Sequence, residues 1–107
     1  MDSHIIVYCT VPSSEIGMKI ADDLVMGKYA ACVSIVPGIT SIYRWKGDLC
    51  KDNELLLIIK SRKALFAEIQ DRIRALHPYE IPEIISCELS EGSEPYLNWI
   101  SDSTHSS

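Results

Sequence analysis

Four apolar stretches of the chain predict β-strands. Their side chains either alternate between apolar and polar or form short runs rich in β-branched residues, and both patterns favour extended structure. The first stretch is apolar almost throughout, which is typical of a strand covered on both faces. The strands are expected at residues 4–11, at 30–36 continuing through 39–45, at 49–60 and at 83–89.

The second and third of these strands are expected to form one long hairpin. A tight turn at residues 46–48 joins them, and Pro37 with Gly38 predicts a bend or β-bulge, because proline cannot donate to a ladder. Each arm of about 15 residues would reach about 50 Å at about 3.3 Å per residue. A compact domain of this length is only about 35 Å across. The hairpin should therefore project beyond its own domain.

Three segments carry apolar residues every three to four positions, which predicts helices with one apolar face each. The first lies between the Ser13–Ser14 pair, which offers capping hydroxyls, and Gly27, which is a plausible stop. The others are expected at residues 62–76 and 94–100. The order β-α-β-β-α-β-α then predicts an α+β fold of the ferredoxin-like βαββαβ type with a short C-terminal helix. We expect residues 1–107 to be a single domain with a frayed tail over about residues 101–107.

Composition and charge narrow the classes of function. The 107 residues are 47% hydrophobic and 23% charged, as in ordinary globular proteins, and this excludes overall disorder. The net charge of −5 argues against nucleic acid and anionic membranes as partners. The four cysteines are far apart, and no secretory signal precedes the first strand. We therefore expect a cytoplasmic protein with free thiols.

The tip of the expected hairpin is apolar. Ile42, Tyr43, Trp45 and Leu49 would be costly to expose in water, and an isolated two-stranded ribbon is marginally stable. Contact with further subunits would cover these side chains, which predicts a cyclic homo-oligomer in which strand edges of neighbouring chains meet. The alternative is a hairpin that folds back over its own sheet at residues 37–38.

Five motifs resemble the CutA divalent-cation-tolerance proteins. They occur in that family's order and spacing and together span nearly the whole chain, so the combination is specific. The motifs are YCTVP at residues 8–12, AACV at 30–33, PGITSIYRWKG at 37–47, HPYEIPE at 77–83 and YLNWI at 96–100. The resemblance implies a homotrimer that is similar to the PII signal-transduction proteins and has a part in the response to copper and other divalent cations. It implies no enzymatic activity.

The resemblance also implies a weak copper site. Where family members have one, its ligands are the first-strand cysteine, a histidine beside the HPY motif and the glutamate of the Pro-Glu pair. Cys9 and Glu83 match, whereas Leu76 stands at the histidine position, so His77 would have to substitute by turning inward. Sulfur, imidazole and carboxylate suit copper or zinc, and three ligands with an open position bind exchangeably, so no cofactor is obligatory. Each residue also has a plainer interpretation: a buried core thiol, a helix-end histidine, and a carboxylate bonded to loop backbone or Lys60.

A second set of residues predicts a cleft between subunits. In a trimer the hairpin tip of one chain would close over the HPYE loop of the next, giving aromatic walls with a few charges, as in small-ligand sites. The alternative is plain interface packing, because Trp, Tyr and Arg are preferred interface anchors. The residues are Tyr43, Arg44, Trp45, Lys60, Tyr79 and Glu83.

Two hypotheses about function follow from the sequence. The first is a non-enzymatic, metal-responsive homotrimer that binds copper or related cations weakly. The second is a PII-like regulatory or adaptor trimer whose clefts bind a small effector or an unidentified partner protein. An enzyme is disfavoured because no nucleophile and base stand at a recognised spacing.

Overall fold

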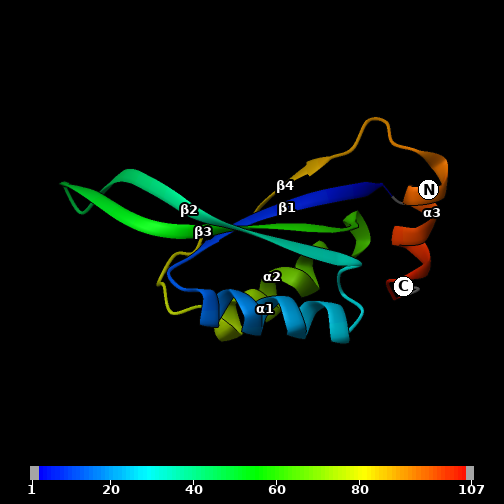
Figure 1. The fold of residues 1–107 in the computed structure, drawn as a ribbon, viewed down its shortest axis with the longest axis horizontal. Coiled ribbons are helices and arrows are strands. Elements are labelled where there is room, and N and C mark those ends of the chain that lie inside the picture. Colours follow the sequence, from blue (N-terminus) through cyan, green and yellow to red (C-terminus); the bar gives the residue numbers. More distant parts are fainter. Residues whose placement is uncertain (1–2, 106–107) are drawn as a thin grey trace.

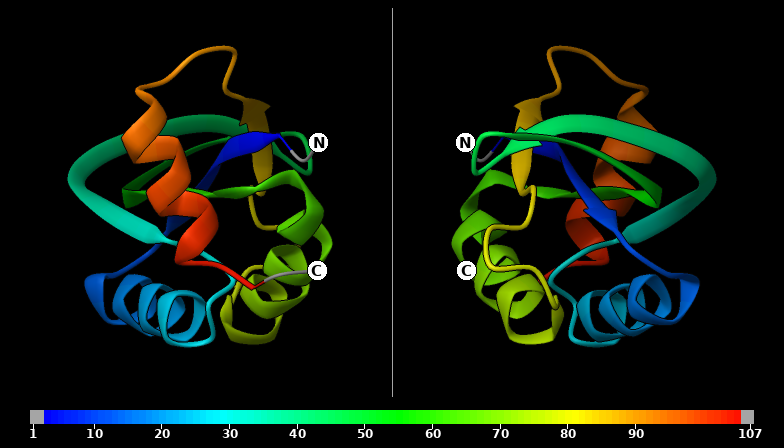
Figure 2. Two further views of the ribbon diagram at one scale, coloured as in Figure 1. Left: turned by 90° about the vertical axis from the view of Figure 1, so that its right-hand side faces the viewer. Right: turned by 90° about the vertical axis from the view of Figure 1, so that its left-hand side faces the viewer.

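The computed structural model, which describes residues 3–105, contains the predicted order of elements (Figure 1). The elements are β1 (His4–Val11), α1 (Ser14–Met26), β2 (Cys32–Trp45), β3 (Asp48–Arg62), the 3₁₀ turn η1 (Lys63–Leu65), α2 (Phe66–Leu76), β4 (Ile85–Glu88) and α3 (Glu94–Asp102). The strands form one antiparallel sheet in the order β2-β3-β1-β4. Figure 2 shows α1 and α2 side by side on one face of this sheet. The predicted α+β arrangement is therefore confirmed.

The alternation of side chains within β1 decides where the core lies. Every second residue from Ile5 to Val11 is buried, and its partners on β3, such as Leu57 and Ile59, are buried with it. From the helices, α1 adds Ile20 and Leu24, and α2 adds Ile69 and Ile73. Each such side chain contributes about 1.5–3 kcal/mol when it leaves water. The other face of the sheet carries no helix of this pair, so the core lies on one side only.

Several element boundaries differ from the sequence prediction, most clearly those of the fourth strand and the second helix. The fourth strand was expected at residues 83–89 but contains only Ile85–Glu88, because it pairs with no more of β1 than Ile5–Tyr8. The second helix was expected from residue 62, yet Arg62 still pairs with His4 as the last residue of β3. No helix in the described part of the chain combines the length and apolar character that a membrane span requires.

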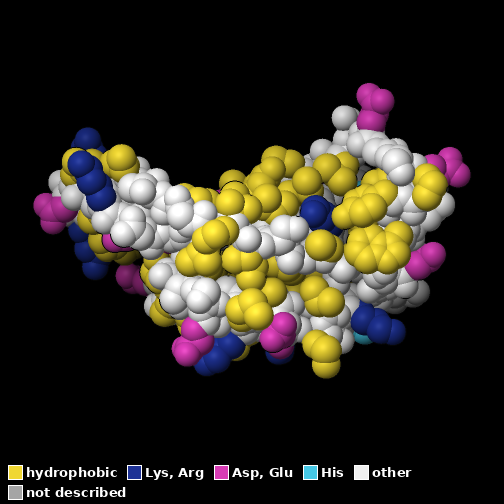
Figure 3. Space-filling view, viewed as in Figure 1, with side chains coloured by type: hydrophobic (Ala, Val, Ile, Leu, Met, Phe, Trp, Pro, Cys, Tyr) yellow, Lys and Arg dark blue, Asp and Glu magenta, His cyan; other side chains and the backbone are white. Residues whose placement is uncertain are grey.

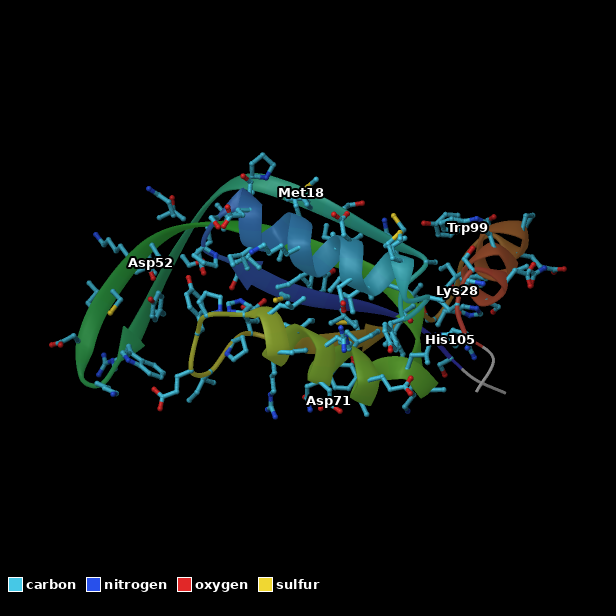
Figure 4. All side chains as sticks on the ribbon, turned by 90° about the horizontal axis from the view of Figure 1, so that it is seen from below. Met18, Lys28, Asp52, Asp71, Trp99 and His105 are labelled. Atoms are coloured by element: carbon cyan, nitrogen blue, oxygen red, sulfur yellow. The ribbon has the colours of Figure 1, made fainter. Side chains whose placement is uncertain are left out.

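The C-terminal residues are ordered through residue 105, so the predicted frayed tail is wrong for residues 101–105. Thr104 is buried; its hydroxyl donates to the Ile100 carbonyl at 3.0 Å and accepts from Arg62 Nε at 2.8 Å. The His105 N–H donates to the Lys28 carbonyl at 2.9 Å, and Figure 4 shows these two residues together. The small polar residues of this segment suggested fraying, but their polar groups form hydrogen bonds with the rest of the fold. Residues 106–107 lie outside the described residues.

The β2–β3 hairpin projects from the body of the molecule, as predicted (Figure 1, left). The molecule measures 44 × 25 × 22 Å. The expected bulge appears as a register shift between Val36 and Ile39, with Gly38 at a φ of 78°. At the tip, Lys46 has a φ of 50° and Gly47 a φ of 85°. Two left-handed central residues are typical of the type I′ turns that match strand twist in hairpins.

Candidate functional site

A cleft of about 610 Å³ opens between the hairpin and the loop of residues 77–84 that follows α2. Figure 4 shows this loop (yellow-green) beside the curved hairpin that carries Asp52. The lining residues are Thr10 at the end of β1, Ser41, Ile42, Tyr43, Trp45 and Glu54 of the hairpin, and Tyr79, Glu80, Ile81 and Glu83 of the loop. One chain therefore forms the cleft by itself. The added closure by a neighbour's hairpin tip stays a prediction.

Two tyrosine–carboxylate hydrogen bonds stiffen the walls of the cleft. The Tyr79 hydroxyl donates to Glu54 Oε2 at 2.7 Å, joining the loop to β3, and Glu54 is only 6% exposed. The Tyr43 hydroxyl donates to Asp52 across the hairpin. The hydrogen bond to Asp52 raises the pKa of Tyr43 to about 12, and burial together with the bond to Glu54 raises the pKa of Tyr79. Both phenols therefore remain protonated donors at neutral pH.

His77 is bound to the backbone through both ring nitrogens. Its Nε2 lies 2.7 Å from the Thr10 carbonyl oxygen, and its Nδ1 lies 3.2 Å from the Tyr79 amide nitrogen. A carbonyl can only accept and an amide N–H can only donate, so Nε2 carries the proton and Nδ1 uses its lone pair on Tyr79. The side chain is nearly buried, at 8% exposed. His77 thus ties the loop to the end of β1 and presents no free lone pair to a metal.

Cys9 lies within β1, whereas Glu83 lies in the loop two residues before β4 and not at the start of that strand as predicted, and the two side chains differ in environment. Cys9 is fully buried, and its pKa is raised to about 12, first by that burial and then by the Glu83 and Glu54 carboxylates. Glu83 is exposed on the cleft. Within residues 3–105, no group of three or more His, Cys, Asp or Glu side chains is placed to hold a metal ion. Because metals bind the thiolate, Cys9, His77 and Glu83 do not form a ready three-ligand copper site in the protomer.

Of the six residues predicted for the cleft, four line it and two do not. Tyr43, Trp45, Tyr79 and Glu83 are in the wall. Arg44 is absent from the lining. The Lys60 Nζ lies 3.4 Å from Ser34 Oγ, far along β3 from the hairpin tip. Glu54 also lines the cleft and was missed by the sequence reasoning.

The fold and the cleft together define a class of protein. It is an α+β protein with a four-stranded antiparallel sheet, two helices on one face, and a projecting hairpin with an acidic, aromatic cleft at its base. The family model described as CutA1 divalent ion tolerance protein matches residues 5–103. The chain belongs to this family.

Individual relatives agree in sequence and in structure. The divalent-cation tolerance protein CutA of Thermus thermophilus is 48% identical over 99 residues, which are 92% of this chain and 96% of the relative. The chloroplastic protein CutA of Arabidopsis thaliana is 47% identical, and the matched 94% of this chain spans only 55% of that relative's length. The crystal structure of CutA1 from Oryza sativa superposes with a TM-score of 0.95 at 43% identity and covers 98% of this chain and 96% of that one.

Proposed function

We propose that this chain is a non-enzymatic divalent-cation tolerance protein that acts as a homotrimer and binds copper or related cations weakly as part of a metal-ion response. The observation that carries this proposal is the family match over residues 5–103, together with a nearly full-length relative named for divalent-cation tolerance. The environments of Cys9 and His77 support weak rather than tight binding of a cation. A cation that binds Cys9 has to displace the thiol proton, which weakens the binding. Both ring nitrogens of His77 are already hydrogen-bonded to the backbone, so neither is free to bind the cation.

The free face of the sheet supports the homotrimer. Ile6, Tyr8, Leu56 and Ile58 alternate with the buried core positions, so they point away from α1 and α2 and are half-buried. Figure 3 shows hydrophobic side chains gathered over these strands. Contiguous apolar patches on a small protein mark contact surfaces. A trimer would cover this face with two further copies of the chain.

The hairpin tip gives a second reason for assembly. Ile42 is 61% exposed and Leu49 is 72% exposed, and both lie on the projecting part of the ribbon. Removing such surface from water is favourable by about 25 cal/mol per Å². A PII-like regulatory role for such a trimer is not favoured, because the names of the relatives refer to cation tolerance or to CutA alone.

The proposed compartment is the cytoplasm. The four cysteines are unpaired in the structure, which fits a reducing environment. Relatives carry names that place them elsewhere, in the chloroplast for the Arabidopsis protein and in the periplasm for the Archaeoglobus fulgidus protein. Imaging of the tagged protein in its own cell tests this part of the proposal, and an extracytoplasmic signal would contradict it.

The copper proposal is tested by calorimetric titration of the purified protein. We expect wild type to bind copper saturably with release of a proton, visible as a dependence of the heat on buffer. A Cys9→Ala, Glu83→Gln double variant should bind at least about tenfold more weakly, because it loses both remaining ligand candidates. Cys87→Ala, which removes an exposed thiol on β4, is the matched control and should bind like wild type. Equal affinity in all three proteins would refute the assignment.

A further inference from the structure

The cleft is lined by carboxylates and aromatic rings, which is typical of a site for an organic cation and not of a metal site. Its walls contain the carboxylates of Glu54, Glu80 and Glu83 and the rings of three aromatic residues, and none of its described lining residues is Lys, Arg or His. Aromatic faces attract ammonium and guanidinium groups through the ring quadrupole, and carboxylates pair with them. The walls therefore offer both kinds of contact that recognise such a group.

The spacing of the carboxylates distinguishes an organic cation from a metal ion. A divalent ion needs several oxygen ligands that converge at about 2.0–2.6 Å. No three carboxylates, imidazoles or thiols among residues 3–105 converge in this way. A cleft of about 610 Å³ instead holds a molecule of several heavy atoms, whose charge can contact separate walls.

Glu54 gives the cleft wall a nearly buried carboxylate that is not ion-paired with a Lys or Arg of the described residues. Its side chain is 94% buried (6% exposed) and lines the cleft, and Oε2 accepts from Tyr79. Within the described residues Oε1 accepts no hydrogen bond, and no Lys or Arg forms an ion pair with this carboxylate. Oε1 is not a buried atom without a partner, so it is accessible to solvent and to a ligand. Charge-assisted pairing with a cation would be favourable for a carboxylate that is otherwise nearly buried. A bound cation would supply the partner that the chain itself does not.

The electrostatics of neighbouring groups point the same way. The hydrogen bond to Asp52, together with the charges of Asp52 and Glu54, raises the pKa of Tyr43, so the field at this wall of the cleft is negative. A field of this sign opposes further negative charge and attracts a positive ligand. The net charge of −5 on the whole chain adds to this attraction at low salt.

We propose that this cleft binds a small organic cation carrying a primary ammonium or guanidinium group, held between the aromatic walls of Tyr43, Trp45 and Tyr79 and paired with Glu54 and Glu83. The site shares Glu83 with the proposed copper ligands but does not include Cys9, which is fully buried in the core. Its occupant is a free small molecule, and a Lys or Arg side chain inserted by a neighbouring subunit is the competing outcome.

Calorimetric titration of the full-length protein with agmatine, in the presence of a metal chelator, tests the proposal. We expect saturable binding of one agmatine per chain that weakens as salt rises. The neutral diol 1,4-butanediol and the dianion succinate should not bind, because neither makes the charge contacts. Absence of saturable agmatine binding, as a cleft filled by a neighbour's side chain would give, or equal binding of the diol, would overturn the proposal.

Variants locate the bound cation. Glu83→Gln removes an exposed charge with little risk to folding and should weaken agmatine binding about tenfold, and Glu54→Gln should weaken it at least as much. Glu94→Gln, at the start of α3 and outside the cleft, is the matched control and should bind like wild type. Equal affinity in Glu83→Gln and the control would refute the site. Cys9→Ala should retain agmatine binding while losing copper, so this inference and the proposed function fail separately.

Discussion

At the scale of single residues, His77 stabilises the fold through two hydrogen bonds to the backbone. Its ring joins the Thr10 carbonyl at the end of β1 to the Tyr79 amide in the loop, and thereby sets the position of the cleft wall. The family resemblance placed the histidine ligand at the position of Leu76, and His77 was expected to replace it only by turning inward. A metal ion could bind the His77 ring only by breaking one of these two hydrogen bonds.

A His77→Ala variant should therefore be less stable. It leaves the Thr10 carbonyl and the Tyr79 amide without partners in a nearly buried site, which costs about 1–3 kcal/mol of unfolding free energy. Urea denaturation followed by circular dichroism measures this loss. Glu80→Gln, an exposed change in the same loop, should leave the midpoint unchanged. An unaltered midpoint for His77→Ala would show that the ring does not hold the loop.

The buried thiol of Cys9 predicts a pH dependence of stability. Its pKa is about 12 in the folded protein and 9.0 in an unconstrained chain, so above pH 9 the unfolded state loses a proton that the folded state keeps. Stability should fall as pH rises from about 9 to about 12, by about 1.4 kcal/mol per pH unit from this group. In a Cys9→Ala variant the slope of unfolding free energy against pH should be shallower over this range. Identical slopes would contradict the burial of an un-ionised thiol.

At the scale of elements, local patterns determined what could be predicted from sequence. The cap of α1 is an example, because Ser13 accepts from the Ile16 amide at 3.3 Å as its position before the apolar periodicity indicated. The short β4 could not be predicted, because its length depends on how much of β1 it meets. Thr104 was missed for a similar reason, since its partner Arg62 is distant in sequence.

The residues of the candidate site also divide into those that local motifs predict and those that depend on distant contacts. Tyr43, Trp45, Tyr79 and Glu83 were predicted from their motifs for a cleft between subunits, and they line this cleft within one chain. Glu54 was missed because its burial depends on Tyr79 reaching back from a loop 25 residues away. Sequence alternation indicates which face of a strand a residue occupies, but a loop that closes over that face is a tertiary feature.

The hairpin turn supplies an element-scale prediction. Gly47 has a φ of 85°, and an added Cβ would meet nothing within 4 Å, so Gly47→Ala probes backbone strain alone. The variant should lose about 1–2 kcal/mol of unfolding free energy. Lys46→Asn should keep or slightly raise stability, because Asn tolerates the left-handed conformation that Lys46 already adopts. Thermal unfolding of both variants checks this, and equal melting temperatures would contradict the assigned turn.

At the scale of the whole molecule, one face of the sheet and one ribbon tip remain apolar after the chain has folded. The helices α1 and α2 cover only the side of β1 that carries Ile5, Val7, Cys9 and Val11. We therefore expect further copies of the chain to cover the opposite side and the projecting hairpin. This expectation connects the local pattern of alternating residues with the proposed homotrimer.

Sedimentation equilibrium of the wild-type protein tests this central claim most directly. The account predicts a single species of three times the 12.0 kDa chain mass, stable on dilution. Ile58→Asp, which places a charge on the free face of the sheet, should shift the distribution toward smaller species. A wild-type protein that sediments as a folded, monodisperse monomer at all concentrations would contradict the account.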